Sequence, residues 1–178
     1  PHQVLIVGVG SIGERHLRCF AQTKRAELSF CEINAPLRET IAGRYGVQKT
    51  FADFDEAVAS RPDIAVICAP AHLHIPMAQK LASAGIHTLC EKPLSVSLDG
   101  IAELSETVER QGDVLGIAYT WRHFPISVAL KESLQSGRFG RPLNLVHVSG
   151  QNFPTYRPAY REIYYCLLYT SDAADERS

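Results

Sequence analysis

The segment Val4–Gly13 reads VLIVGVGSIG, in which a short apolar run leads directly into three glycines with the spacing G-x-G-x-x-G. The run Val4–Val7 is too short and too β-branched for a helix and has no polar alternation. It therefore predicts a strand buried on both faces of a parallel sheet. An amphipathic helix is expected after the glycines, and a second predicted strand, Leu28–Cys31, ends in the acidic residue Glu32. This order favours a dinucleotide-binding loop over an ordinary strand–turn–helix.

Each glycine has a separate part in such a loop. Gly8 permits the tight turn, Gly10 lets the main chain approach a pyrophosphate, and Gly13 lets the helix pack closely on the strand. The first backbone N–H groups of the helix, at Ser11 and Ile12, and the positive end of the helix dipole then face the phosphates. We therefore expect these five residues to bind a dinucleotide cofactor.

The residue at the end of the second strand favours one dinucleotide over the other. The Glu32 carboxylate can accept hydrogen bonds from the hydroxyls of the adenine ribose, and its charge repels a 2′-phosphate. NAD is therefore expected, and NADP is the less favoured cofactor. Arg38 follows a few residues later and can hold a 2′-phosphate if its loop folds inward, but such an arginine is more often a solvated helix residue.

Composition is consistent with a globular protein that binds a small molecule. At 178 residues and 46% hydrophobic content, the chain can bury one full core and part of a second. A formal net charge of -1 gives no electrostatic case for nucleic acid or an anionic membrane. No apolar run approaches the roughly 20 residues of a membrane span, and no charged-then-apolar leader precedes the first strand. The five cysteines form no C-x-x-C pair, so we expect free thiols, a reducing, cytoplasmic location and no metal site.

Predicted strands and helices alternate as far as Ala118, which implies right-handed crossovers and a doubly wound parallel α/β sheet of the Rossmann type. After Glu32 the expected elements are a helix from Pro36 to Gly46, strand Lys49–Phe51, a helix from the cap Asp53 to Ala59, strand Ile64–Cys68, helix Ile75–Ala84, strand His87–Cys90, helix Leu98–Gln111 capped by Ser97, and strand Val114–Ala118. Beyond Pro125 a helix, Ile126–Ser136, and a long alternating strand, Leu143–Gln151, predict the opening of a second domain with an antiparallel sheet. We thus expect a cofactor domain at residues 1–124 and the beginning of a second domain at 125–165.

Unusual residues follow three of the predicted strands. The fourth strand leads into Ala69-Pro70 and His74, the fifth into Glu91-Lys92-Pro93, and the sixth into Tyr119, Arg122 and His123. Taken singly, each group has an ordinary interpretation as turn, cap or surface residues. Because ligands bind outside the carboxyl ends of strands in open α/β sheets, the three groups together predict a site beside the glycine loop.

With these motifs, the chain resembles the Gfo/Idh/MocA oxidoreductases from Gln3 to about Tyr165. The resemblance rests on the glycine loop followed by His16, on Pro70 with His74, on Glu91-Lys92-Pro93-Leu94-Ser95, and on Arg122 with Phe124-Pro125. It implies an N-terminal Rossmann domain and a C-terminal α/β domain whose open, mainly antiparallel sheet forms a homo-oligomer. It also implies NAD(P)-dependent oxidation or reduction of a secondary alcohol on a sugar or cyclitol.

The resemblance also implies residue roles. Lys92 corresponds to the family's active-site lysine, which can hold the substrate hydroxyl and stabilise negative charge on its oxygen during hydride transfer. Glu91 would set the position and charge of Lys92, and Pro93 would shape the strand exit through a cis peptide. The remaining roles are contacts to the nicotinamide side of the cofactor from Ala69, Pro70 and His74, and contacts to substrate from Tyr119, Arg122 and His123. Ala71 stands where many members have Asn, so that cofactor contact is not expected here.

The segment Cys166–Ser178 reads CLLYTSDAADERS and breaks the preceding pattern. Back-translated as TGT-CTC-TTA-TAC-ACA-TCT-GAC-GCT-GCC-GAC, it resembles a transposase-type sequencing adapter; the alternative is a slightly acidic helix. With an adapter here, native sequence is expected to stop near Tyr165. The family's Asp-x-x-x-His base helix would then be missing, so we expect cofactor binding without turnover.

Two other function classes stay open. A dinucleotide-sensing regulator would bind cofactor without chemistry and would need no lysine at the end of the fifth strand. A methyltransferase-like fold shares the glycine loop and the ribose-binding acid, but it predicts neither the Glu-Lys-Pro motif nor a second domain after Pro125.

Overall fold

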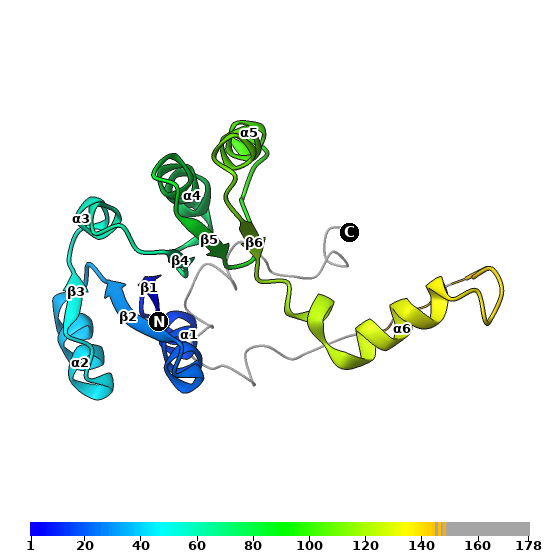
Figure 1. The fold of residues 1–178 in the computed structure, drawn as a ribbon, viewed down its shortest axis with the longest axis horizontal. Coiled ribbons are helices and arrows are strands. Elements are labelled where there is room, and N and C mark those ends of the chain that lie inside the picture. The colour runs from blue at the N-terminus through cyan, green and yellow to red at the C-terminus, as the bar shows by residue number, and fades with distance from the viewer. Residues whose placement is uncertain (145, 147, 149–178) are drawn as a thin grey trace, which may run out of the picture. The chain divides into compact units, whose positions relative to one another are not determined.

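The computed structural model describes residues 1–144, 146 and 148, in which the chain forms a six-stranded parallel sheet (Figure 1). The strands are β1 (His2–Val7), β2 (Ala26–Cys31), β3 (Lys49–Phe51), β4 (Ile64–Ile67), β5 (His87–Cys90) and β6 (Leu115–Ile117). Their order across the sheet is β3-β2-β1-β4-β5-β6, and every neighbouring pair is parallel. The order reverses between β1 and β4, which is the switch point where doubly wound sheets bind ligands. The predicted Rossmann arrangement is confirmed.

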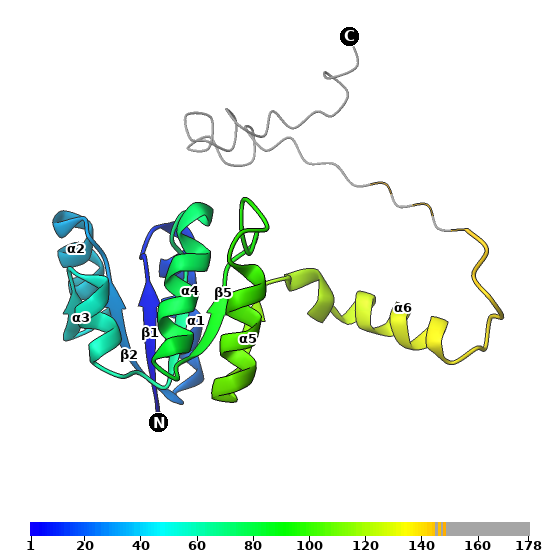
Figure 2. The same ribbon diagram turned by 90° about the horizontal axis from the view of Figure 1, so that it is seen from above.

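Helices cover both faces of this sheet. The α-helices are α1 (Ser11–Thr23), α2 (Ala35–Tyr45), α3 (Phe54–Ala59), α4 (His74–Ser83) and α5 (Ile101–Gln111), with short 3₁₀ helices at Ala71–Leu73 and Thr120–His123. α1 and α2 lie on one face, whereas α3, α4 and α5 lie on the other (Figures 1 and 2). Each crossover therefore returns the chain to the same edge of the sheet, as parallel pairing requires.

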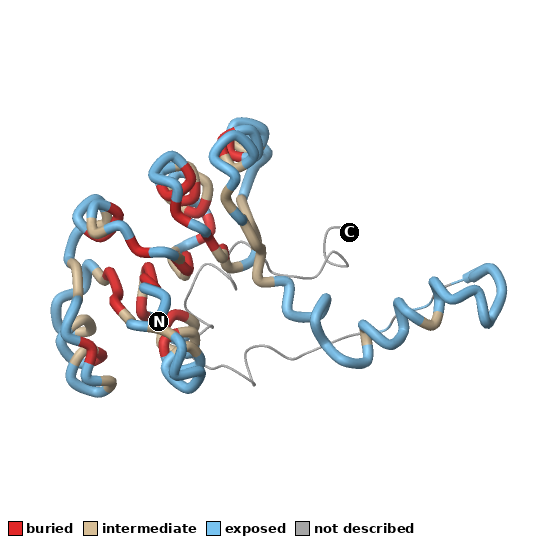
Figure 3. The backbone as a smooth tube through the Cα atoms, viewed as in Figure 1, coloured by how far each residue is buried: buried red, intermediate tan, exposed pale blue. Residues whose placement is uncertain are grey.

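The core follows from the two-residue period of β1, the central strand. Leu5 and Val7 pack into the cluster beneath α3, α4 and α5, while Val4 and Ile6 pack into the cluster beneath α1 and α2. All four side chains are buried, as the unbroken apolar run predicts. Figure 3 shows buried segments concentrated in the sheet and on the inner sides of the helices. The glycine loop thus begins at a strand that is held from both faces.

Local signals set several helix boundaries. The Asn34 side chain accepts a hydrogen bond from the Leu37 N–H at the start of α2, which ends at Gly46 with a φ of 66°. The start of α5 differs from the prediction, because the helix begins at Ile101 after Gly100 and not after Ser97. The Ser97 hydroxyl instead forms a local turn with Asp99, accepting from its N–H and donating to its carboxylate, so it caps that turn and not the helix.

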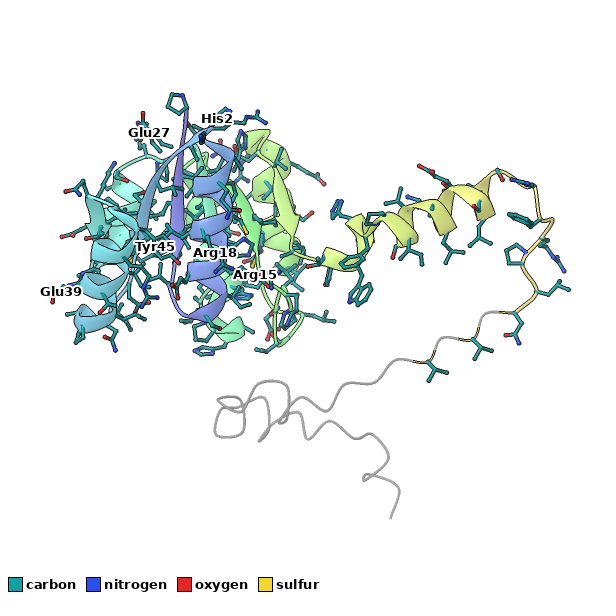
Figure 4. All side chains as sticks on the ribbon, turned by 90° about the horizontal axis from the view of Figure 1, so that it is seen from below. His2, Arg15, Arg18, Glu27, Glu39 and Tyr45 are labelled. Atoms are coloured by element: carbon teal, nitrogen blue, oxygen red, sulfur yellow. The ribbon has the colours of Figure 1, made fainter. Side chains whose placement is uncertain are left out.

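Polar side chains join α1 to α2 at the surface. The Glu14 carboxylate accepts hydrogen bonds from the Tyr45 hydroxyl, at 2.8 Å, and from the Arg44 guanidinium. These two hydrogen bonds hold the pKa of Glu14 below its usual range. Arg18, one turn along α1, lies close to Tyr45 (Figure 4). The first turns of α1 are therefore anchored to the end of α2.

The chain divides into two units near Val128, close to the boundary predicted at residue 124. Helix α6 (Pro125–Gln135) confirms the helix predicted there, and none of its residues, all of which are described, is buried.

The strand predicted from Leu143 is not found in the part of it that the structure describes. Leu143, Val146 and Val148 are outside any strand and 79% or more exposed, without a neighbouring strand to pair with in the described chain. The rest of that predicted strand, and the segment Cys166–Ser178, lie outside the described residues. No described helix has the length and apolar character that a membrane span requires.

Candidate cofactor and active site

The parallel sheet brings the carboxyl ends of its strands to one edge. β1 leads into Gly8, β2 into Glu32, β4 into Ala69 and Pro70, and β5 into Glu91. The neighbours β1 and β4 flank the point where strand order reverses, so the glycine loop lies beside the segment that follows β4. This arrangement confirms that the predicted strand-end residues share one edge.

The glycine loop has the geometry that its spacing predicts. Gly8 has a φ of +83°, a left-handed conformation that glycine adopts without strain, and its N–H donates to the Cys31 carbonyl at 2.8 Å. A Cβ added at Gly13 would lie 1.8 Å from the Gly8 carbonyl oxygen, so only glycine lets α1 approach the loop this closely. A Cβ at Gly10 would meet nothing within 4 Å, which leaves open space beside the main chain.

The N-terminus of α1 is available to an anion. Its N-cap residue, Gly10, has no side chain, and no hydrogen bond within residues 1–144 occupies the N–H groups of Ser11, Ile12 and Gly13. The Gly10 carbonyl accepts from the Glu14 N–H at 2.8 Å and closes the first turn. Free first-turn N–H groups at the positive end of a helix suit a phosphate.

A cavity of about 310 Å³ opens next to this loop, near the lower end of the roughly 300–1,000 Å³ typical of small-molecule sites. Five predicted cofactor residues line it: Gly8, Gly10, Glu32, Ala69 and Pro70. The rest of the lining includes an apolar wall that was not predicted from the sequence, formed by Ile33, Phe54, Leu73 and Met77. Only Phe54 had a usable signal, because an aromatic residue directly after the helix cap Asp53 lies at the carboxyl edge of the sheet.

Glu32 is fixed above the loop by main-chain donors. One carboxylate oxygen accepts from the Val9 N–H at 3.0 Å, and the other accepts from the Asn34 N–H at 2.9 Å. The Arg38 guanidinium donates to the Glu32 main-chain carbonyl at 2.6 Å and not to the carboxylate. The carboxylate is therefore oriented at the cavity wall, with lone pairs left for further donors.

The end of β5 is tied directly to α1. The His16 ring donates from Nε2 to Glu91 Oε1 at 2.8 Å, and the Lys92 N–H donates to Glu91 Oε2 at 3.2 Å. Burial favours the neutral acid, but the hydrogen bonds from His16 and the Lys92 amide outweigh it and hold the pKa of Glu91 below its usual range. The peptide bond between Lys92 and Pro93 is cis, as predicted. The Glu91-Lys92-Pro93 segment thus lies beside the helix of the glycine loop.

His74 has a different position from the one expected of a cofactor contact. It is 1% exposed and does not line the cavity beside the glycine loop. Its Nδ1 lies 2.7 Å from the Pro93 carbonyl oxygen and its Nε2 lies 2.8 Å from that of Ala69. The first residue of α4 therefore faces inward and links the segments that follow β4 and β5.

The three predicted substrate residues lie beyond β6. Tyr119 precedes the 3₁₀ helix Thr120–His123, which contains Arg122 and His123, and all three side chains are exposed. None of them lines the cavity at the glycine loop, and Glu91 and Lys92 do not line it either. The described chain contains no cluster of three or more His, Cys, Asp or Glu side chains that could hold a metal ion.

Together these features fit a dinucleotide. The cavity beside Glu32 suits the adenosine half, the open N-terminus of α1 suits the phosphates, and the Glu91-Lys92 segment lies on the next strand end along the edge.

Comparison with known proteins agrees with this geometry. Residues 2–119 match the model of an oxidoreductase family with an NAD-binding Rossmann fold. An inositol 2-dehydrogenase of Salmonella paratyphi B is 27% identical over 94% of this chain and 52% of its own length. A D-glucoside 3-dehydrogenase of Escherichia coli is 25% identical over 79% of this chain and 41% of its own length.

A solved structure of the WlbA dehydrogenase from Bordetella pertussis, in complex with NADH and UDP-GlcNAcA, superposes with a TM-score of 0.72 at 27% identity. It matches 78% of this chain and 43% of the other. The chain therefore spans about half the length of the relatives it matches. It belongs to the Gfo/Idh/MocA family of oxidoreductases with an NAD-binding Rossmann fold.

Proposed function

We propose that this chain is the NAD-binding part of an oxidoreductase that transfers hydride between a nicotinamide and a secondary alcohol of a sugar or cyclitol. The observation that carries the proposal is the anchored Glu32 carboxylate at a cavity that also contains Gly8 and Gly10. The names of the relatives, which act on inositol and on glucosides, support the substrate class. The activity, substrate and homo-oligomeric state of the whole protein are part of this proposal.

The chain's own residues would divide the work along one edge of the sheet. Glu32 would bind the ribose hydroxyls, the N–H groups of Ser11 and Ile12 would bind the phosphates, and Ala69 and Pro70 would contact the dinucleotide from β4. The bound nicotinamide accepts or supplies the hydride. The Lys92 ammonium, which follows the end of β5, would bind the substrate hydroxyl and stabilise negative charge as it develops on that oxygen.

The cofactor choice is tested by titrating the purified protein with NAD and NADP and following intrinsic fluorescence. NAD should bind at least about tenfold more tightly, equal to about 1.4 kcal/mol, because a 2′-phosphate would lie against the Glu32 carboxylate. Glu32→Gln keeps the size of the side chain, removes its charge and should shrink the preference. Arg38→Ala is the matched control and should leave the preference unchanged, since Arg38 is bound to a main-chain carbonyl. Tighter NADP binding by the unmodified protein would overturn the choice of NAD.

The reaction class is tested separately with the whole protein. Reduction of NAD over a panel of sugars and cyclitols supports an oxidoreductase, whereas NAD binding without turnover of any of them favours a dinucleotide-sensing module.

The proposed domains, 1–124 and 125–165, predict that limited proteolysis cleaves first near residue 125.

A further inference from the structure

We infer that His16 is a positioning residue that captures the Glu91 carboxylate and so leaves the Lys92 amine free to meet a substrate. This inference deepens the proposed function and rests on the role proposed there for Lys92. It concerns a contact between α1 and the end of β5 whose two partners are 75 residues apart in the sequence.

Both carboxylate oxygens of Glu91 accept hydrogen bonds, from two different directions. His16 binds one carboxylate oxygen and the Lys92 amide binds the other. The side chains of His16 and Glu91 are 22% and 17% exposed, so water competes weakly for this bond. Glu91 is therefore an ionised carboxylate with a fixed direction and not a mobile surface acid.

Lys92 is adjacent to this carboxylate, and its charge helps to lower the pKa of Glu91, yet the two side chains make no direct contact. Lys92 is exposed, and within residues 1–144 its ammonium has neither a hydrogen bond nor a salt bridge. A carboxylate next to an unpaired ammonium is an obvious partner for it. Because Glu91 Oε1 is bound to His16, the carboxylate is held toward α1 and the ammonium is left without a direct hydrogen bond to it.

Hydrogen bonds restrain the main chain on both sides of Lys92. The Glu91 N–H donates to the Ile67 carbonyl at 3.0 Å, and His74 lies 2.7 Å from the Pro93 carbonyl oxygen. These contacts oppose a shift of the main chain that would carry Lys92 away from Glu91. Whether the Lys92 amine is free therefore depends on which side chain binds the Glu91 carboxylate. In this structure that side chain is His16.

The experiment measures the rate at which trinitrobenzenesulfonate labels Lys92, read peptide by peptide by mass spectrometry, with Lys24 and Lys131 as internal references. Only an unprotonated amine reacts, and an ion pair with Glu91 would stabilise the ammonium. His16→Ala should therefore slow labelling of Lys92 about two- to fivefold, the range that an exposed ion pair allows. The double variant His16→Ala/Glu91→Gln should restore the original rate, since no carboxylate is left to pair. His16→Gln, which keeps an N–H donor, should label like the unmodified protein.

If His16 only stabilised the fold, the pattern would differ. The double variant His16→Ala/Glu91→Gln would then label Lys92 as slowly as His16→Ala, because removing the charge of Glu91 would restore nothing. An unchanged rate in His16→Ala, or a slow rate that persists in the double variant, would overturn the inference. His16→Asn, which keeps polarity but has a shorter reach, gives a second loss variant should His16→Ala fold poorly. No cofactor is present in this experiment, so its failure leaves the proposed function standing. Failure of the unmodified protein to bind NAD would overturn the function and leave the labelling result valid.

Discussion

Gly13→Ala tests whether the close packing of α1 on the glycine loop requires glycine at position 13. The new Cβ would lie 1.8 Å from the Gly8 carbonyl oxygen and 2.8 Å from its carbonyl carbon. Both neighbours are backbone atoms, so no side chain can rotate away, and α1 must move from β1 by more than an ångström. Overpacking a core typically costs about 1–3 kcal/mol, and a clash with backbone belongs at or above the upper end. We expect a loss of about 3 kcal/mol in the free energy of unfolding, which lowers Tm by about 10 °C for a unit of this size.

Gly10→Ala is the matched control within the same loop. Its Cβ would meet no atom within 4 Å, and Gly10 has a φ of -61°, which an alanine adopts readily. The stability of the protein should therefore hardly change. NAD binding should weaken at least about tenfold, because the methyl group would fill the space through which the phosphates approach the main chain.

Thermal unfolding followed by circular dichroism, together with NAD titration, separates the two effects. The expected pattern is lost stability for Gly13→Ala and lost binding with normal stability for Gly10→Ala. A Gly13→Ala protein as stable as the unmodified one would refute the packing argument. A Gly10→Ala protein that binds NAD normally would refute the assignment of the phosphate site.

Two further predictions concern titration and thiol reactivity. Because the pKa of Glu91 lies below its ordinary value of 4.5, the stability contributed by the ionised carboxylate is complete above that pH and is lost as the pH falls through the lower folded value. Glu91→Gln should therefore reduce the loss of unfolding free energy that occurs as the pH falls below about 4.5. Urea unfolding at a series of pH values measures this, and an equal loss in the variant and the unmodified protein would contradict it. Burial raises the pKa of Cys31 to about 11 and that of Cys90 to about 12, and it also raises the pKa of Cys68. Iodoacetamide at pH 8 should accordingly modify the exposed Cys19 well before these three, and equal rates in peptide mass spectrometry would show the thiols to be accessible.

Much of the site could be predicted because parallel strands end at one edge. Once the sequence placed Gly8, Glu32, Pro70 and Glu91 at strand ends, the topology alone required them to be neighbours. The apolar cavity wall was harder to predict, since residues such as Leu73 and Met77 look like any core residues of a helix. Their role depends on which side of the 3₁₀ helix Ala71–Leu73 and of α4 is turned toward the cavity, and that depends on how these helices pack on the sheet.

The hydrogen-bond partners of His16 and His74 could not be predicted from the sequence. His74 stands directly after a strand-end motif, so a cofactor contact was expected, whereas the structure buries it between two main-chain carbonyls. His16 belongs to the glycine motif and suggested no partner, yet it binds Glu91 at 2.8 Å. Glu91 and the Pro93 carbonyl each lie beyond at least one further helix and strand of the chain, so no local pattern encodes these contacts, although the second carbonyl at His74, that of Ala69, is only five residues away.

By itself, the sequence determined the order of strands and helices in the cofactor domain and the loop between its first strand and helix. An apolar β-branched run is buried on both faces of the sheet. Gly13 is required because a Cβ there would clash with the Gly8 carbonyl oxygen. Only the tertiary structure decided which polar groups meet at the strand ends. A hydrogen bond requires donor and acceptor within about 3 Å, and that proximity arises from strand order and helix packing between segments far apart in the chain. The pairing of His16 with Glu91, which leaves Lys92 unpaired within the described chain, is therefore a property of the fold.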